Sequence, residues 1–236
     1  MFTKGDDPSG AIMAPYDEKD PNMKFMKALR DDDGSRLNLE EELYCAWPEV
    51  TVNYIPEDDR SEGMAQKNFY MFYSTMLKAT KEKAIGVAVS EDGFRWLKRG
   101  VALRPDADMM DDGGCARCTV VRKAHYNDNG VWESSDGWYM LYEGVSSNDG
   151  KHRVMAAESN DLRNWTKLGV VLDVGDEGSW DHDGVGAPHL LRLDDGSTRM
   201  YYTGQCVDGN TAIGVAKCEE DLTEWVREQA TLSFSE

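Results

Sequence analysis

The chain has no long apolar run, no basic stretch and no even set of cysteines, and each absence excludes a class of protein. Its apolar runs are only a few residues long, far below the ~20 that a membrane-spanning helix needs. Lys and Arg number 26 against 44 Asp and Glu, which gives a formal net charge of −18. Binding to a nucleic-acid backbone requires a basic surface, so nucleic acid is excluded as a partner. The composition predicts a highly soluble acidic protein.

The cysteines do not form a recognisable disulfide or metal pattern. There are five of them, and an odd number does not suit a disulfide scaffold. Cys115 and Cys118 form one C-x-x-C motif, but an odd separation on a strand directs the two thiols to opposite faces. No second pair completes a zinc set, so we predict free thiols, no metal and no cofactor.

The compartment is predicted only from weak signals. Residues 1–10 are polar and acidic, without the basic start and apolar stretch of a secretory signal. Together with the unpaired cysteines, this favours an intracellular or organellar location.

What the chain does have is a pattern repeated three times. An aromatic strand occurs as FYMFYS at 69–74, WYMLYE at 138–143 and MYYTG at 200–204. Each is followed by a strand of small and β-branched residues at 85–90, 154–159 and 213–216. A repeat of strands and turns at this spacing is typical of a β-propeller.

The repeat predicts an all-β fold with two parts. Residues 1–40 form an acidic, partly extended arm, and residues 41–236 form the propeller domain, with units at about 43–104, 115–172 and 185–235. Propellers close with about four to eight blades. The ring is therefore either incomplete or closed by the N-terminal arm.

Each unit also contains an Asp-x-x-x-Trp turn. We expect the aspartates to accept bonds from backbone amides in the turn, and the tryptophans to begin the outer strand and pack against the next blade. The pairs are Asp92 and Trp96, Asp161 and Trp165, and Asp221 and Trp225.

The first strand of each unit has its own motif: AWPEV at 46–50, ARCTVV at 116–121 and GAPHLL at 186–191, the last preceded by WDHDGV at 180–185. With the aromatic strands that follow, these motifs resemble the five-bladed propeller clan of arabinanases, β-xylosidases, invertases and levansucrases. The likeness covers roughly residues 43–232.

The resemblance implies three carboxylates in an axial funnel. They are a base or nucleophile Asp just before a Pro, an Asp that tunes a pKa and holds the sugar, and a general-acid Glu two residues before a Pro. The corresponding positions here are Trp47, Arg117 and Gly186. Glycoside cleavage needs an acid together with a base or nucleophile. The resemblance therefore predicts that the fold is kept and that catalysis is lost.

Other acidic residues precede or end the strands near the same funnel. Asp181 and Asp183 come before the third inner strand, Asp112 comes before the second, and Glu143 ends an aromatic strand. One interpretation is a relocated acid pair drawn from these four. The other is that they cap turns and face solvent.

Aromatic, basic and imidazole side chains are the candidate ligand-binding groups. Trp47 and Trp180 have the flat apolar face on which a sugar ring stacks, and Arg117 suits a carboxylate or phosphate. His182 and His189 lie near the third inner strand and are further ligand-binding candidates.

The sequence leaves two functions open. The first is a glycosidase-like propeller that binds a glycan, or a protein partner in a larger assembly, without catalysis. The alternative is an active glycoside hydrolase on an arabinan, xylan or fructan type of substrate that uses displaced carboxylates.

Overall fold

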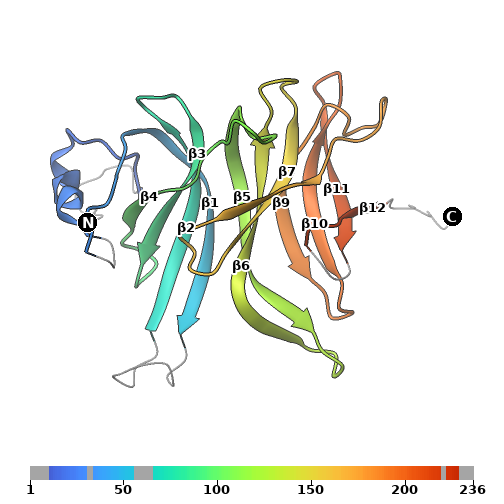
Figure 1. Cartoon of the computed structure of the whole chain (residues 1–236), viewed down its shortest axis with the longest axis horizontal. Helices are drawn as coiled ribbons and strands as arrows, with labels where there is room; N and C mark the ends of the chain where they lie inside the picture. Colours follow the sequence, from blue (N-terminus) through green and yellow to red (C-terminus); the bar gives the residue numbers. More distant parts are fainter. Residues whose placement is uncertain (1–10, 31–33, 56–65, 219–221, 229–236) are drawn as a thin grey trace.

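Three four-stranded antiparallel blades make up most of the molecule (Figure 1). The computed structural model describes residues 11–30, 34–55, 66–218 and 222–228. The first blade contains β1 (Glu42–Ile55), β2 (Gln66–Leu77), β3 (Lys83–Ser90) and β4 (Leu97–Leu103). The second contains β5 (Gly114–Tyr126), β6 (Trp132–Val145), β7 (His152–Ser159) and β8 (Thr166–Leu172). The third contains β9 (Gly184–Arg192), β10 (Thr198–Gln205), β11 (Thr211–Cys218) and β12 (Val226–Glu228).

The first strands of consecutive blades lie next to one another. β1 contacts β5, and β5 contacts β9. A single parallel pair, His152 with Gly184, joins the second blade to the third. The three repeat units and the all-β fold are therefore confirmed, with the first strand of each unit innermost.

Apolar side chains from neighbouring sheets meet between the blades. One cluster joins the first two blades around Phe72, Ile85 and Met140, and a second joins the last two around Leu141 and Met200. Each such layer removes large apolar side chains from water, at about 1.5–3 kcal/mol for each fully buried one. Packing between blades therefore holds the array together.

The tryptophans after the turns pack in the opposite direction to the one expected. Trp165 of the second blade makes an edge contact with Phe72 of the first, with ring centroids 5.6 Å apart and planes at 86°. Trp225 joins the cluster between the second and third blades. Each indole therefore contacts the blade that comes before its own in the sequence, because the outer strand directs the indole toward that sheet.

The aspartates of these turns act as expected. Asp92 Oδ1 accepts from the amides of Phe94 and Arg95, both at 2.8 Å. Asp161 Oδ1 accepts in the same way from the amides of Arg163 and Asn164. Asp221 lies outside the described residues.

A buried carboxylate, a tyrosine and a cation recur in every blade, and we call each set a blade triad. The carboxylate precedes or begins the inner strand, the tyrosine comes from the second strand, and the cation from the fourth. The three sets are Glu42, Tyr73 and Lys98; Asp111, Tyr142 and Lys167; and Asp181, Tyr202 and Arg227. Because each charge is paired and also hydrogen-bonded, its burial is compensated.

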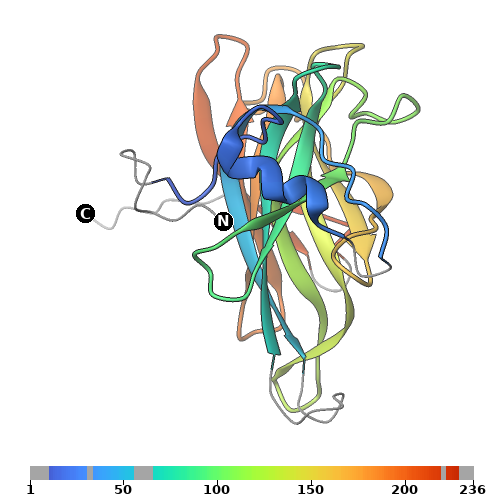
Figure 2. The same cartoon turned by 90° about the vertical axis from the view of Figure 1, so that its left-hand side faces the viewer.

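The N-terminal arm lies against the first blade. Its 3-10 helix η1 (Pro21–Ala28) is held by a small core of Tyr16, Met23 and Met26. Met13 packs on the first blade beside Tyr73. Figure 2 shows η1 in front of that blade, and Figure 1 shows the third blade on the opposite side of the molecule. The described part of the arm thus covers the outer face of the first blade, and closure of the ring is not seen among the described residues.

Cys115 and Cys118 form no disulfide, and their placement differs from the alternation rule. A register shift after Ala116 places Cys115 and Cys118 against the same apolar cluster. The extra residue resets the alternation of the strand. Within the described ranges, no helix combines the length and apolar character needed to cross a membrane.

Candidate functional site

Three left-handed residues mark the inner strands at equivalent points. Trp47 in β1, Arg117 in β5 and Ala187 in β9 have φ angles of 49°, 33° and 49°. In all three strands a register irregularity accompanies this backbone. Such conformations cost about 1–3 kcal/mol for residues other than glycine and gather at functional sites. The fold therefore maintains an unfavourable backbone at two of the positions to which the resemblance assigns the acids, Trp47 and Arg117, and next to the third, Gly186.

Glu143, near the end of β6, connects these strands. Its Oε2 accepts from the Arg117 guanidinium at 3.1 Å and from the Ala187 amide at 2.9 Å. Its Oε1 lies 2.7 Å from His152 Nδ1. The Arg117 guanidinium lies over the Trp47 indole, 4.4 Å from the ring centroid. We call Trp47, Arg117, Glu143 and His152 the axial cluster.

The Glu143 carboxylate fills the space beside Gly186. A Cβ added at Gly186 would lie 2.3 Å from Glu143 Oε2, much closer than any real contact. A side chain at position 186 would therefore displace the Glu143 carboxylate from its present position. By the resemblance, position 186 is that of the general acid. A carboxylate from a different strand thus occupies the base of that position.

Electrostatics keep Glu143 ionised. Burial raises its pKa, but the bond from His152, the charges of Arg117 and His152 and the Ala187 amide together hold the pKa below its ordinary value. The side chain is only 4% exposed, whereas those of Arg117 and His152 are 38% and 40% exposed. The acid therefore lies behind the two basic groups, which face solvent.

Trp47 and Arg117 are fixed by further contacts. The Arg117 amide donates to Ser74 Oγ at 2.8 Å. Tyr44 meets the Trp47 ring edge-on, with centroids 6.4 Å apart. Trp47 remains 49% exposed, so an apolar ring edge borders the charged groups. An aromatic surface beside fixed donors is the usual composition of a sugar-binding site.

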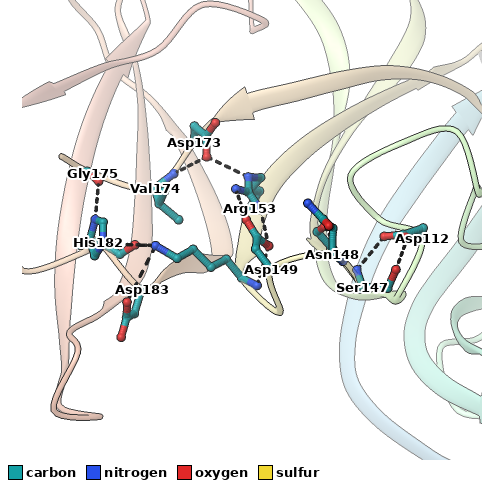
Figure 3. Close-up of polar contacts among 12 residues, drawn as sticks. Asp112, Ser147, Asn148, Asp149, Arg153, Asp173, Val174, Gly175, His182 and Asp183 are labelled. Atoms are coloured by element: carbon teal, nitrogen blue, oxygen red, sulfur yellow. Dashed lines mark hydrogen bonds and ion pairs between the residues drawn. The ribbon is translucent and has the colours of Figure 1, made fainter. Parts of the chain in front are cut away.

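The loop candidates form a separate polar group (Figure 3). Asp112 accepts from the Ser147 amide at 2.7 Å and from its hydroxyl, and these bonds hold the pKa of Asp112 low. His182 Nδ1 lies 3.1 Å from the Gly175 carbonyl oxygen. Asp183 lies 3.8 Å from Lys151 Nζ. These contacts fix turns, and none of them reaches the axial cluster.

Asp181 and Trp180 belong to the architecture of the third blade. Asp181 is buried and accepts from Arg227 at 2.8 Å and from Tyr202 at 3.0 Å. Burial raises its pKa, but the bond from Arg227 and those from Ser179 and Tyr202 bring it below the ordinary value. The Trp180 ring stacks on Tyr202 with centroids 5.7 Å apart. Both residues are therefore occupied by packing within their own blade.

His189 and Glu49 form a further acid–base neighbourhood on the inner strands. Glu49 accepts from Thr119 Oγ1 at 3.2 Å and from the Val120 amide at 3.3 Å. Burial raises the pKa of Glu49, and these two bonds and the nearby His189 only partly offset that rise. In the part of the chain that the structure describes, no three His, Cys, Asp or Glu side chains group as metal ligands.

Two of these functional candidates were not predicted from the sequence, His152 and Glu49. His152 had a detectable signal, because Glu143 pairs with Val154 across the β6–β7 hairpin. His152 is two residues before Val154, so it is the diagonal neighbour of Glu143 on the same face. Glu49 had no such signal in the sequence, because its hydrogen-bond partners lie on the next inner strand.

Comparisons with known proteins agree with the architecture. No family model matches the chain. A sucrose-6-phosphate hydrolase of Bacillus subtilis (strain 168) is 28% identical over 127 residues, covering 52% of this chain and 22% of that protein. A family 117 glycoside hydrolase of the marine bacterium Zobellia galactanivorans superposes with a TM-score of 0.60 at 18% identity. The superposition covers 79% of this chain and 56% of the Zobellia structure.

A structure from the GH130 family of mannoside phosphorylases, which contains glycoside hydrolases that target β-1,2-mannosidic linkages, has a TM-score of 0.58 at 19% identity. The superposition covers 97% of this chain and 58% of that structure. The chain thus spans little more than half the length of these structures and about a fifth of the curated relative. The likeness places the chain in the fold of the β-propeller glycosidases.

Proposed function

We propose that this glycosidase-like propeller binds a carbohydrate at the axial cluster without hydrolysing it. The observation that carries the proposal is the state of Glu143. It occupies the space beside Gly186, is 4% exposed and makes three hydrogen bonds. A general acid must be protonated at the working pH and must reach the leaving oxygen. Glu143 has a lowered pKa and lies behind Arg117 and His152.

The exposed groups of the cluster support binding. Trp47 offers an exposed apolar ring edge, and Arg117 and His152 offer polar contacts. Because the backbone at Trp47 and Arg117 is already constrained, less conformational freedom is lost when a ligand binds.

The alternative, a hydrolase with displaced carboxylates, is favoured by one observation. Glu143 positions His152 through Nδ1 at 2.7 Å, an arrangement in which a carboxylate orients an imidazole that transfers protons. Glu49, whose pKa is raised by burial, is a candidate for a protonated acid on the inner strands.

A titration with arabino-, xylo- and fructo-oligosaccharides distinguishes the two. We expect binding detected by calorimetry, lost in Trp47→Ala, and no release of reducing sugar over days. Turnover that survives purification and disappears in both Glu143→Gln and His152→Ala would overturn the binding proposal in favour of the hydrolase. No interaction with any sugar would refute both.

A structural role in an assembly is favoured by the third blade. Ile213 is 73% exposed, although its counterparts Ile85 and Val154 in the first two blades are fully buried between blades. Tyr201 is likewise 40% exposed, where Phe72 is buried. By continuity with the blade interfaces of the chain, this face fits a further β-blade supplied by a partner. Light scattering tests this idea: a monomer whose behaviour is unchanged by Ile213→Lys argues against self-association through this face.

A further inference from the structure

The groups that the axial cluster shows to solvent are basic or aromatic. The Glu143 carboxylate is buried behind them, and its oxygens already accept three bonds. Arg117 uses Nη1 for Glu143 and keeps 38% of its side chain exposed. His152 uses Nδ1 and keeps 40% exposed. A ligand entering here therefore meets a guanidinium, an imidazole and an indole.

We infer that the ligand of this site is a sugar that carries an anionic group, a carboxylate or a phosphate, and that this group binds between Arg117 and His152. The inference rests on the proposed function and specifies its ligand. A guanidinium is planar and matches two oxygens of a carboxylate or phosphate at once. The Arg117 guanidinium carbon lies 4.4 Å from the centroid of the Trp47 ring, and the exposed part of that indole offers an apolar contact to the sugar ring.

The guanidinium is held in place before any ligand arrives. The Arg117 backbone amide donates to Ser74, Arg117 Nη1 donates to Glu143, and the guanidinium lies over the Trp47 ring. Glu143 likewise fixes the ring of His152. Neither side chain has to give up much rotamer freedom on binding, so more of the interaction energy appears as affinity.

The net charge of −18 does not oppose this assignment at contact distance. The Debye length is about 8 Å at physiological ionic strength, so distant surface carboxylates are largely screened. A charge-assisted contact at about 2.8 Å is not screened in this way. The acidic surface instead lowers non-specific attraction of anions, which leaves recognition to the cluster itself.

The test is a titration, followed through the Ala187 amide in NMR spectra, with matched pairs of probes. The pairs are galacturonic acid with galactose, and glucose 6-phosphate with glucose, with inorganic phosphate added alone as a third arm. We expect the anionic member of at least one pair to bind at least tenfold more tightly than its neutral counterpart.

The variants are chosen so that the fold survives. Arg117→Gln alone would leave Glu143 charged and buried, so it is combined with Glu143→Gln, and Arg117→Lys is a second variant that keeps the ion pair. Both should lose the tenfold preference. Arg122→Gln is the control, because Arg122 is another arginine of β5 that lies over an indole, 5.9 Å above Trp138, and it should keep the preference.

Each other outcome contradicts the inference in a recognisable way. Equal affinity for charged and neutral sugars would overturn the inference and leave the proposed function standing. Inorganic phosphate binding as tightly as glucose 6-phosphate would show an anion site without sugar recognition. A preference that persists in both Arg117 variants would place the anion elsewhere. Failure of all sugars, neutral or charged, would refute the proposed function as well.

Discussion

The blade triads allow a quantitative test of what holds the array together. In the second blade Lys167 Nζ bonds to Asp111, which also accepts from Tyr142 at 2.9 Å and lies 3.2 Å from Cys115 Sγ. Asp111 is 0% exposed and the Lys167 side chain 10%. Replacing Lys167 by Met keeps most of the apolar stem but leaves a buried carboxylate without its counter-charge.

The expected cost of Lys167→Met is large. Removing one partner of a buried ion pair costs about 3–5 kcal/mol, because the remaining charge loses its compensation. For a chain of this size that corresponds to a fall of about 6–20 °C in melting temperature. The free energy of unfolding is measured by urea titration with linear extrapolation.

A double variant and a surface control make the reasoning refutable. In Asp111→Asn/Lys167→Met no charge remains, so most of the lost stability should return, since replacing a whole buried pair is often near neutral. Lys78→Met breaks a pair with Glu41 at 3.3 Å whose side chains are 42% and 28% exposed, and it should cost about 0–1 kcal/mol. A loss below about 1 kcal/mol for Lys167→Met, or no recovery in the double variant, would show that the cost does not come from a buried charge left without its counter-charge.

Three further results are expected. Gly186→Ala should destabilise the protein by about 1–3 kcal/mol, because the added Cβ would lie 2.3 Å from Glu143 Oε2. Adding Glu143→Ala to that variant should remove the clash and raise the melting temperature again. The free energy of unfolding should fall as the pH drops from about 4.5 to 2. Glu143, Asp181 and Asp149 have lowered pKa values in the folded protein, that of Asp149 about 2. The stability that these carboxylates contribute above their unfolded pKa values is therefore lost as the pH falls through their folded pKa values. Trp165→Ala should cost about 3–5 kcal/mol in urea unfolding, because the indole packs between the first two blades.

The sequence predicted the blades because a β repeat is local. In each unit the aromatic strand, the small-residue strand and the turn follow one another within fewer than about thirty residues, and the structure places the units in successive sheets. The direction in which Trp165 packs was not predictable in this way. It depends on how the outer strand of one sheet faces the sheet before it, which no local pattern contains.

The site was predicted in part. Trp47 and Arg117 were identified through their place on the inner strands, and Glu143 through its position at a strand end. The partners of Asp181, Tyr202 and Arg227, were not predicted, because a carboxylate beside a strand has the same local sequence whether it faces a ligand or a buried cation. The acid and the tyrosine are 31 residues apart in the first two triads and 21 apart in the third. The spacing therefore repeats for Glu42 and Asp111 but gives no such signal for Asp181.

The geometry of Glu143 supports the proposal of binding without cleavage on energetic grounds. To donate a proton it would have to leave Arg117, His152 and the Ala187 amide, and bonds that involve a charged group are worth about 1.5–3 kcal/mol each. Losing three of them would raise the barrier by several kcal/mol, and each 1.36 kcal/mol slows a reaction tenfold. The same three bonds help a binding site, because they hold Arg117 and His152 where a ligand meets them. A fold shared with hydrolases does not fix the reaction. Here the placement of one carboxylate behind two basic groups favours recognition over bond breaking.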